Sequence, residues 1–387
     1  MAASTILGTL RAMLTPEEKQ RYARHFTLPE LGETGQEKLK AGSVLCIGTG
    51  GLGSPAAMYL AAAGVGKIGL VDSDHVEPSN LQRQIIHGES WIGKPKLESA
   101  KHRLLEINPH IEVVTHDARF TAKNAREIAE PYDIIIDGTD NFPTRYLSND
   151  LAYFTGKPNV YGSIFRFEGQ VSVFAPHLGG PCYRCMLPNP PDPGTVPSCA
   201  EAGVLGVLPG IIGSLQAMEA IKLIAGIGTP PTGKLVHYDA LNTTFRNFTL
   251  RKDPECILCG PNPSVTDLID YDGFCGVPNT ESMKEITVQE LATALKQGLD
   301  GILVDVRTPE EWDAAKLDGT IHIPLQELPN RYSELPSDQK IYIHCKAGGR
   351  SAKACQFLEA QGYSDLTNVK GGIDAWRTLI DPTLPMA

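Results

Sequence analysis

A glycine-rich turn near residue 50 is the first group of residues whose types and spacing suit chemistry. Gly48-Thr49-Gly50-Gly51-Leu52-Gly53 follows the apolar run 43–47 and precedes the apolar run 56–63. In a strand–turn–helix unit of this kind, backbone N–H groups bind phosphate, because glycine permits close approach and positive φ. We expect Ser54-Pro55 to supply the N-cap and first helical residue, and Gly64 to follow the helix end. The turn predicts a nucleotide-phosphate site.

The residues after the next strand bear on which nucleotide binds. Asp72 follows the glycine turn by about 20 residues, where a carboxylate accepts hydrogen bonds from a ribose of either NAD or ATP. Hydrogen-bond donors and cations come next, namely Asn80, Arg83, Gln84 and Lys96. Arginine binds phosphate through two hydrogen bonds and lysine acts as a point charge. Because a dehydrogenase does not require such groups beside the ribose, the set favours ATP.

Carboxylates end a further apolar strand at Asp137-Gly138-Thr139-Asp140-Asn141. Ligands of open α/β sheets bind at this edge, and a carboxylate beside a triphosphate is a suitable ligand for Mg²⁺. We expect Asp140 to hold Mg²⁺, with a cap of the next turn as the alternative role for Asp137.

Four of the nine cysteines form two CxxC pairs, Cys182 with Cys185 and Cys256 with Cys259. Four thiolates in two close pairs suit a closed, structural Zn²⁺ site, and a redox pair is the alternative for either one. The odd cysteine count and these pairs argue against a disulfide framework.

A strand–loop–helix unit near the end of the sequence carries the third group. Cys345 begins the loop Lys346-Ala347-Gly348-Gly349, and Arg350 begins the helix. Loop N–H groups and the helix dipole form an anion-binding nest that favours a thiolate. Such a loop suits phosphate-ester or persulfide chemistry, and a buried structural cysteine is the alternative. The loop is one residue shorter than in cysteine phosphatases, which favours the persulfide.

Length and composition limit the classes of protein. A chain of 387 residues is expected to form two or three domains. The net charge of -10 argues against non-specific or direct nucleic-acid binding. We find no apolar run of the roughly 18–20 residues that span a membrane and no signal-peptide pattern, so we expect a cytoplasmic protein without a membrane partner.

Strand-like and helix-like segments alternate from about residue 41 to 240, which predicts a mainly parallel, Rossmann-like sheet covered by helices. A long apolar helix is expected over 205–225, and further strands over 235–238 and 243–250. We expect a first domain over 1–262, a linker over 263–285, and a smaller α/β domain over 286–387. In the last, Thr287 and Glu290 have capping-box spacing, and strands are expected at 302–306 and 341–344.

Residues 21–260 resemble the ubiquitin-activating-enzyme superfamily, in particular the molybdopterin-synthase adenylyltransferases and their thiamin-pathway relatives. The motifs that carry the resemblance are the glycine turn, Ser79-Asn80-Leu81-Gln82-Arg83-Gln84, Gly93-Lys94-Pro95-Lys96, the 137–141 run and Gly213-Ser214-Leu215-Gln216-Ala217-Met218-Glu219-Ala220. The resemblance implies ATP-dependent adenylation of the C-terminal Gly-Gly carboxylate of a small ubiquitin-like sulfur-carrier protein.

The same resemblance implies roles for single residues. Asp72 holds the ribose, three residues hold the phosphates, Asp140 holds Mg²⁺, and Arg24 is supplied across a homodimer interface; the three phosphate residues are Asn80, Arg83 and Lys96. It also implies the zinc site. Cys199 resembles a crossover-loop cysteine that conjugating relatives use for a thioester; in sulfur-carrier activators it relays sulfur, attacks the adenylate or has no essential role.

The C-terminal unit resembles rhodanese sulfurtransferases. The resemblance rests on the Cys345–Arg350 loop, Val304–Trp312, Gly319–Leu325 and Gly371–Trp376. It implies that Cys345 carries a persulfide, supplied by a donor such as a cysteine desulfurase, with the loop amides and Arg350 stabilising the anion. The fused arrangement predicts that the carrier is adenylated and then converted to a thiocarboxylate, in molybdopterin, thiamin or tRNA-thiolation metabolism.

Two alternatives belong to other classes. One is an activator of a ubiquitin-like protein for conjugation through a Cys199 thioester, and the other is an NAD-binding oxidoreductase or redox sensor.

Overall fold

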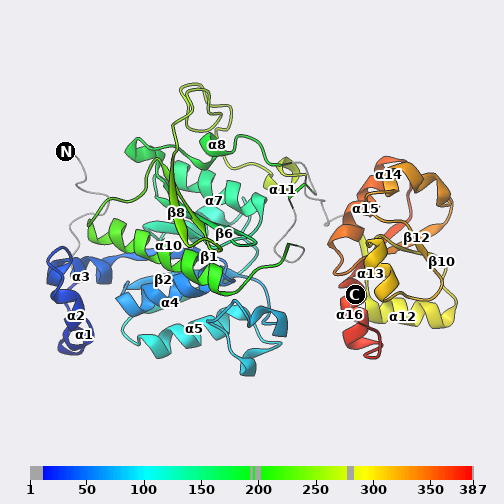
Figure 1. Cartoon of the computed structure of the whole chain (residues 1–387), viewed down its shortest axis with the longest axis horizontal. Helices are drawn as coiled ribbons and strands as arrows, with labels where there is room; N and C mark the ends of the chain where they lie inside the picture. The colour runs from blue at the N-terminus through cyan, green and yellow to red at the C-terminus, as the bar shows by residue number, and fades with distance from the viewer. Residues whose placement is uncertain (1–11, 192–194, 197–201, 277–282, 386–387) are drawn as a thin grey trace. The chain divides into compact units, whose positions relative to one another are not determined.

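The computed structural model describes residues 12–191, 195–196, 202–276 and 283–385. The chain divides into unit 1, Met1–Cys275, and unit 2, Gly276–Ala387, and each unit has its own sheet (Figure 1). The fold class predicted from the sequence is confirmed in both units.

Unit 1 is built on one eight-stranded sheet in the order β3-β2-β1-β4-β5-β6-β7-β8. Its strands are β1 (Ser43–Ile47), β2 (Lys67–Asp72), β3 (Glu112–Asp117), β4 (Ile134–Asp137), β5 (Asn159–Phe165), β6 (Glu168–Phe174), β7 (Lys234–Asp239) and β8 (Thr244–Thr249). The first five strands in that order are parallel, and β6, β7 and β8 continue the sheet as antiparallel neighbours. The chain leaves β1 in one direction through β2 and β3 and returns to its other side as β4. The carboxyl ends of β1 and β4 therefore form the switch point where such sheets bind ligands.

Helices cover this sheet on both faces (Figure 1). They are α1 (Pro16–Arg21), α2 (Ala23–Phe26), α3 (Gly32–Ala41), α4 (Gly53–Ala63), α5 (Lys96–Ile107), α6 (Ala125–Ala129), α7 (Phe142–Thr155), α8 (Tyr183–Met186), α10 (Val207–Ala225) and α11 (Tyr271–Phe274).

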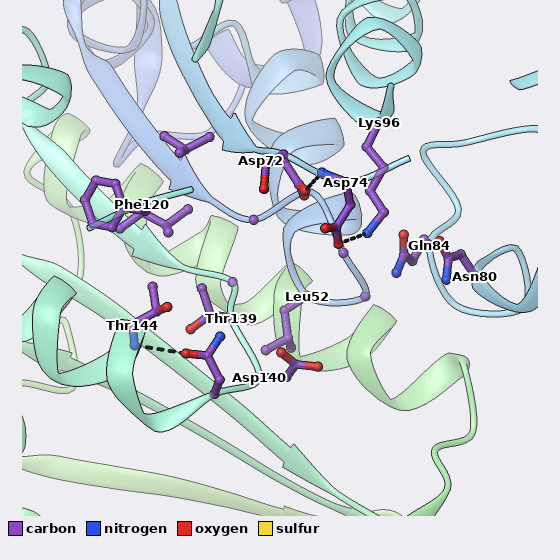
Figure 2. Close-up of a pocket in the computed structure, with 18 of the residues that line it drawn as sticks. Leu52, Asp72, Asp74, Asn80, Gln84, Lys96, Phe120, Thr139, Asp140 and Thr144 are labelled. Atoms are coloured by element: carbon purple, nitrogen blue, oxygen red, sulfur yellow. Dashed lines mark hydrogen bonds and ion pairs between the residues drawn. The ribbon is translucent and has the colours of Figure 1, made fainter. Parts of the chain in front are cut away.

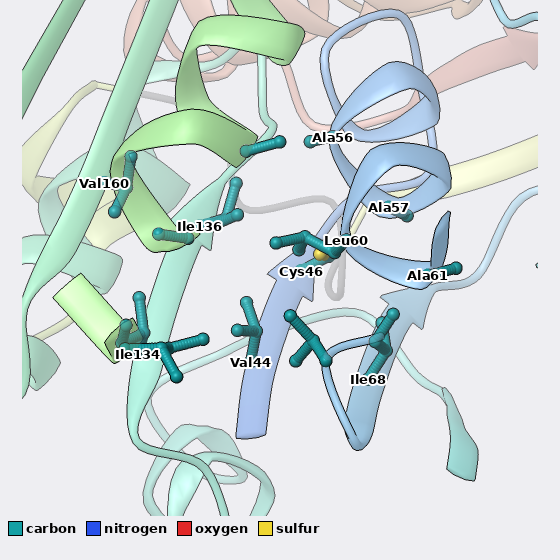
Figure 3. Close-up of a cluster of buried hydrophobic side chains, with 14 of the residues drawn as sticks. Val44, Cys46, Ala56, Ala57, Leu60, Ala61, Ile68, Ile134, Ile136 and Val160 are labelled. Carbon is teal, nitrogen blue, oxygen red and sulfur yellow. The ribbon is translucent and has the colours of Figure 1, made fainter. Parts of the chain in front are cut away.

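The side chains of β1 show how both faces are buried. Val44 and Cys46 point into a core made with α4, α5 and α10, whereas Leu45 and Ile47 pack with α6 and α7 on the other face. Figure 3 shows Val44 and Cys46 facing Leu60 of α4. Because successive strand residues alternate sides, a strand buried on both faces is an uninterrupted apolar run, which is the pattern that predicts it from sequence.

The start of α4 differs from the expectation. The helix begins at Gly53, with Leu52 in the cap position, so Ser54 is not the N-cap. The Ser54 hydroxyl instead donates to the Thr49 carbonyl oxygen across the turn, at 3.1 Å. The predicted end is confirmed, since Gly64 adopts φ 81° there.

Helix α10 is the long apolar helix that the sequence predicts. Against the expectation that no such run exists, it is long and apolar enough, by length and composition, to cross a membrane. Half of it is buried inside unit 1, where it packs on α4 and β5. A core helix covering a sheet has this composition.

The first half of the segment expected as a linker packs against unit 1. Tyr271 and Cys275 are buried in the same core as α7, and Tyr271 donates to Asp150 at 2.9 Å. Ion pairs of Asp267 with Arg126 and of Asp272 with Arg119 hold this segment further. The structure thus places residues 264–275 with the first unit.

Unit 2 is a five-stranded parallel sheet in the order β11-β10-β12-β13-β9. Its strands are β9 (Lys284–Thr287), β10 (Gly301–Asp305), β11 (Thr320–His322), β12 (Lys340–His344) and β13 (Leu366–Lys370). Its helices are α12 (Val288–Gln297), α13 (Pro309–Ala314), α14 (Leu328–Arg331), α15 (Gly349–Ala360) and α16 (Gly372–Leu379). The capping box of Thr287 and Glu290 is confirmed at the start of α12. The neighbouring strands β10 and β12 form the switch point of this sheet, as β1 and β4 do in unit 1.

Candidate functional sites

A cavity of about 340 Å³ lies at the carboxyl ends of β1, β2 and β4 in unit 1. Most of the residues predicted to bind the nucleotide border it: Gly48, Gly50, Gly51, Asp72, Asn80, Arg83, Gln84, Lys96 and Asp140. Figure 2 shows two groups of polar side chains, one from the β2–α5 segment and one from the β4–α7 segment. Fold topology therefore brings together residues that lie far apart in the sequence.

The glycine turn is tightly closed. Gly48 has φ 88°, a left-handed conformation that favours glycine. A Cβ on Gly53 would lie 1.9 Å from the Gly48 carbonyl oxygen, so no side chain fits there. Gly53 does not border the cavity; its absence of a side chain permits the turn, while Gly48, Gly50 and Gly51 face the ligand space.

The β2–α5 segment forms the first wall of the cavity. Asp72 accepts hydrogen bonds from the backbone N–H and hydroxyl of Thr49, at 2.8 and 2.7 Å, which ties the end of β2 to the glycine turn. The nearly buried Lys96 ammonium pairs with the exposed Asp74 at 2.8 Å (Figure 2). Gln84 is buried, and among the described residues its Oε1 has no hydrogen-bond partner. An ammonium paired only with an exposed carboxylate is available for a phosphate.

The β4–α7 segment forms the second wall, and its two carboxylates differ in environment. Asp137 is fully buried and accepts from the Thr139 N–H, the Thr139 hydroxyl and Ser148. Burial raises its pKa, although these hydrogen bonds and Arg145 act in the opposite direction. Asp140 is exposed and borders the cavity. Asp137 thus has the geometry of a turn residue, and Asp140 has that of a ligand residue.

Arg145, in the first turns of α7, is a cavity residue that the sequence analysis does not identify. It is 8% exposed, and its guanidinium lies 5.7 and 5.8 Å from the ring centres of Phe142 and Tyr161. Burial opposes its charge, but Tyr161 and other nearby acidic groups raise its pKa overall. An arginine is the one side chain that stays protonated under these conditions. The sequence pattern that could have identified Arg145 is its position four residues after the N-cap Asn141, on the helix that follows Asp140.

A further predicted residue does not border this cavity, and another cannot be placed in the structure. Arg24 lies in α2, is exposed, and does not border the cavity of its own chain. Cys199 lies outside the described residues.

The four cysteines of the CxxC pairs come together in unit 1. The Sγ atoms of Cys182, Cys185, Cys256 and Cys259 all lie within 4.8 Å of one another. Neighbouring Sγ–Sγ distances are 3.7, 3.5 and 3.4 Å. Four thiolates at the corners of a tetrahedron with Zn–S bonds of about 2.3 Å have similar spacing, so the donor set fits Zn²⁺.

A buried ion pair fixes the first CxxC pair to the body of unit 1. Arg184, between Cys182 and Cys185, pairs with Asp150 of α7 at 2.7 Å, and both side chains are fully buried. The Asp150 carboxylate also accepts from Tyr271, and the Arg184 guanidinium lies over Tyr146 and Phe274. The pair therefore connects three segments that are distant in sequence.

Cys345 stands directly after β12 in unit 2 and is 1% exposed. The Gly348 N–H donates to its Sγ at 3.1 Å, and the Ser351 hydroxyl lies 3.4 Å from it. The loop carbonyls of Cys345 and Lys346 accept from the N–H groups of Ile373 and Asp374 at the start of α16. A Cβ on Gly372 would lie 2.3 Å from the Cys345 oxygen, so a glycine is required for this close approach. Of the loop N–H groups expected to form the nest, that of Gly348 contacts the sulfur in the described part of the chain.

Arg350 makes a contact that the sequence analysis does not anticipate. Its two terminal nitrogens pair with both carboxylate oxygens of Glu311 in α13, at 2.6 and 2.7 Å. Glu311 also accepts from the Thr308 N–H in a capping box, so one carboxylate joins the loop after β10 to the loop after β12. Burial acts against ionisation, but Arg350 and the cap lower the pKa of Glu311 to about 2. Arg350 is thus paired with Glu311, and the Gly348 N–H and the Ser351 hydroxyl contact the sulfur.

Together, fold and sites define a nucleotide-binding α/β unit with a four-cysteine cluster, joined in one chain to a unit that presents a thiol in a loop at a helix start. Comparisons with known proteins agree with this class. Residues 22–258 match the ThiF family and residues 287–379 match the rhodanese-like domain. The chain belongs to the ThiF family and carries a rhodanese-like domain, which confirms the resemblance read from the motifs.

Relatives share both units. The probable adenylyltransferase/sulfurtransferase MoeZ of Mycobacterium tuberculosis is 47% identical over 383 residues, which is 96% of each chain. The adenylyltransferase and sulfurtransferase MOCS3 of Aedes aegypti is 42% identical and covers 96% of this chain and 90% of its own. The sulfur carrier protein adenylyltransferase of Thermus thermophilus is 52% identical over 267 residues, 68% of this chain and 98% of its own. Among solved structures, E. coli MccB with ATP has a TM-score of 0.52 at 23% identity, over 62% of this chain and 74% of that chain, which shows the fold alone.

Proposed function

We propose that this chain is an adenylyltransferase and sulfurtransferase that adenylates the C-terminal Gly-Gly carboxylate of a small ubiquitin-like sulfur carrier and then converts it to a thiocarboxylate. The observation that carries the proposal is the unit 1 cavity, where the glycine turn, Asp72, the nearly buried Lys96 and Asp140 meet. The activities for which MoeZ, MOCS3 and the Thermus thermophilus relative are named support it.

Adenylation requires two anions to react. A carrier carboxylate oxygen forms a bond to the α-phosphorus of ATP, and the bond to the bridging oxygen breaks, so that pyrophosphate leaves with the electron pair. Asp72 orients the ribose, and Asn80, Arg83, Gln84 and Lys96 bind the phosphates. Asp140 would hold Mg²⁺, which neutralises phosphate charge. Catalysis here consists of positioning and charge neutralisation, and no protein nucleophile is required.

Sulfur transfer uses the unit 2 loop. A persulfide on Cys345, loaded by a donor such as a cysteine desulfurase, attacks the acyl carbon through its terminal sulfur and AMP leaves. The resulting acyl disulfide releases the carrier thiocarboxylate when an external thiol reductant attacks the Cys345 sulfur and breaks the S–S bond. Cys345 is left in a mixed disulfide, which a second equivalent of the thiol reduces. The Gly348 N–H, at 3.1 Å from Sγ, and the helix α15 dipole stabilise the negative sulfur.

The four-cysteine cluster and Arg24 have supporting roles in this proposal. Cys182, Cys185, Cys256 and Cys259 hold a structural Zn²⁺, which fixes the end of unit 1 to its body. Arg24 is exposed and outside the cavity of its own chain, as a residue supplied to a partner subunit would be. The proposed assembly is a homodimer in which each Arg24 completes the partner's site.

The test combines purified protein, ATP with Mg²⁺, a persulfide donor, a thiol reductant and a panel of carriers that end in Gly-Gly. Mass spectrometry of each carrier should show the mass change for oxygen replaced by sulfur, and only when ATP and the donor are both present. No adenylate and no thiocarboxylate on any carrier would refute the proposal. A stable thioester of the carrier on Cys199 would instead indicate conjugation.

Mixing two inactive variants tests the role of Arg24. R24A and D140N are each expected to lose carrier-dependent pyrophosphate exchange, because each removes a different part of every site. In mixed dimers one of the two sites receives both intact residues, so mixing should restore part of the activity. No recovery in dimers shown to have exchanged subunits would place Arg24 outside the partner's site.

A further inference from the structure

Arg145 is a buried cation at the edge of the unit 1 cavity, and no role described above uses it. Its residue is 8% exposed, and it borders the cavity together with Thr139, Asp140 and Ile164. The helix position is fixed, because Asn141 caps α7 by accepting from the Thr144 N–H at 3.0 Å. The cap therefore fixes the backbone from which the Arg145 side chain reaches the cavity.

The guanidinium is incompletely paired within the described part of the chain. Its Nε is buried without a hydrogen-bond partner, and its side chain makes one long hydrogen bond, to the Thr139 carbonyl oxygen at 3.4 Å. Two other cations that border the cavity are each paired with a carboxylate. Lys96 pairs with Asp74 at 2.8 Å and Arg119 pairs with Asp272 at 2.7 Å. The nearby carboxylates Asp137 and Asp140 favour the charge of Arg145, but within the described residues neither is hydrogen-bonded to the guanidinium, so its open donors are available to a ligand carboxylate.

The arrangement of the cavity walls indicates which anion that is. The β2–α5 wall contains the groups for ribose and phosphates, Asp72 and Lys96 among them (Figure 2). Arg145 lies on the β4–α7 wall with the polar residues Asp140, Asn141 and Thr144, and the cavity also borders the apolar Ile164 of β5 and Val204. A glycine tail has no side chains and ends in a carboxylate, so it can bring a negative charge to the buried cation at the edge of this cavity.

Building on the function proposed above, we propose that Arg145 is a catalytic residue that binds the attacking C-terminal carboxylate of the carrier. Its guanidinium pairs with the carboxylate and holds it toward the α-phosphate. The pair reduces the repulsion between the carboxylate and the triphosphate, and it leaves Lys96 and Asp140 to act on the nucleotide side. No proton moves in this step, since both arginine and carboxylate keep their charges until the new bond to phosphorus forms.

Binding of two forms of the carrier tests this assignment. One form ends in the natural glycine carboxylate and the other in glycine carboxamide, and affinities are measured with α,β-methylene-ATP and Mg²⁺ present. In the unaltered protein the carboxylate form should bind about 10- to 100-fold more tightly, which is the range for a buried charge-assisted hydrogen bond. In R145M this preference should fall at least about tenfold, while affinity for the carboxamide carrier changes little.

The ratio of the two affinities separates recognition from a structural role. If Arg145 only supports the fold, R145M lowers the affinity for both forms of the carrier equally. The preference for the carboxylate form then stays as in the unaltered protein, which overturns the inference. R103M on the exposed surface of α5 is the matched control and should keep the full preference. If R145M does not fold, R145K, which keeps the charge but loses the planar pair of donors, should show an intermediate preference, and an unchanged one overturns the inference.

The outcome is distinguishable from failure of the proposed function. An unaltered protein that adenylates no carrier and does not distinguish carboxylate from carboxamide refutes the function itself. An unaltered protein that adenylates the carrier, together with an R145M variant that retains the preference, refutes the role of Arg145 alone.

Discussion

The ion pair between Glu311 and Arg350 permits a quantitative prediction about unit 2. The two side chains make two hydrogen bonds at 2.6 and 2.7 Å and each is 19% exposed. E311Q keeps the shape and an acceptor for the Thr308 N–H cap but removes the charge that faces Arg350. We therefore expect E311Q to destabilise unit 2 at neutral pH.

The pKa of Glu311 gives the magnitude and the pH range. A fall from 4.5 to about 2 corresponds to about 3 kcal/mol of stabilisation at about 1.4 kcal/mol per pH unit. Solvent reaches the pair, and screening reduces this to about 1–2 kcal/mol. Because the pKa is lower in the folded state, the stabilisation is complete above pH 4.5 and disappears as the pH falls toward 2.

Urea unfolding of the full-length chain measures this effect. Of the three tryptophans, Trp312 and Trp376 lie in unit 2, so a W91F background makes the fluorescence report on unit 2 alone. E311Q in this background should lower the free energy of unfolding by about 1–2 kcal/mol at pH 7 and by much less at pH 3. E359Q, at an exposed position of α15, is the control and should change little.

Two results would refute the reasoning. The first is an E311Q variant as stable as its W91F parent at pH 7. The second is a destabilisation of the same size at pH 3 as at pH 7, which would show that the lost contact is not the ion pair.

Three further predictions concern the other sites. C345A should abolish thiocarboxylate formation but retain carrier-dependent pyrophosphate exchange, and loss of both in a folded variant would contradict the separate roles of the units. K96M should raise the KM for ATP about 10- to 100-fold in the exchange assay, because a charge-assisted bond to phosphate is lost; an unchanged KM would exclude Lys96 from the phosphate site. C256S should lose zinc, measured by elemental analysis, and lower the unfolding temperature of unit 1 in calorimetry, because ligand loss removes metal-linked folding energy; full zinc content would contradict a four-cysteine site.

Local sequence patterns predicted much of unit 1 and less of unit 2. Some features could be predicted because each depends on residues that are neighbours in the sequence. They are the apolar runs of β1 and β4, the end of α4 at Gly64 and the Thr287 capping box. The strands β9, β11 and β13 were not predicted. Strands β9 and β11 are short and mostly exposed or intermediate, so they lack the apolar signal of a central strand. Strand β13 is buried, but the polar residues Thr367 and Asn368 interrupt its apolar run.

The sequence by itself determined which chemical groups the protein has and the order of its motifs. It supplied the glycine turn, the paired cysteines and the Cys345 loop, because their spacing is a property of a few adjacent residues. Only the tertiary structure decided that Asp137 is buried in a turn while Asp140 faces the cavity, and that Arg350 is held by Glu311. It also decided that Arg145 is a buried cation to which no carboxylate of the described residues is hydrogen-bonded. The physical reason is that burial and charge pairing depend on which distant segments pack together, and no local pattern specifies that.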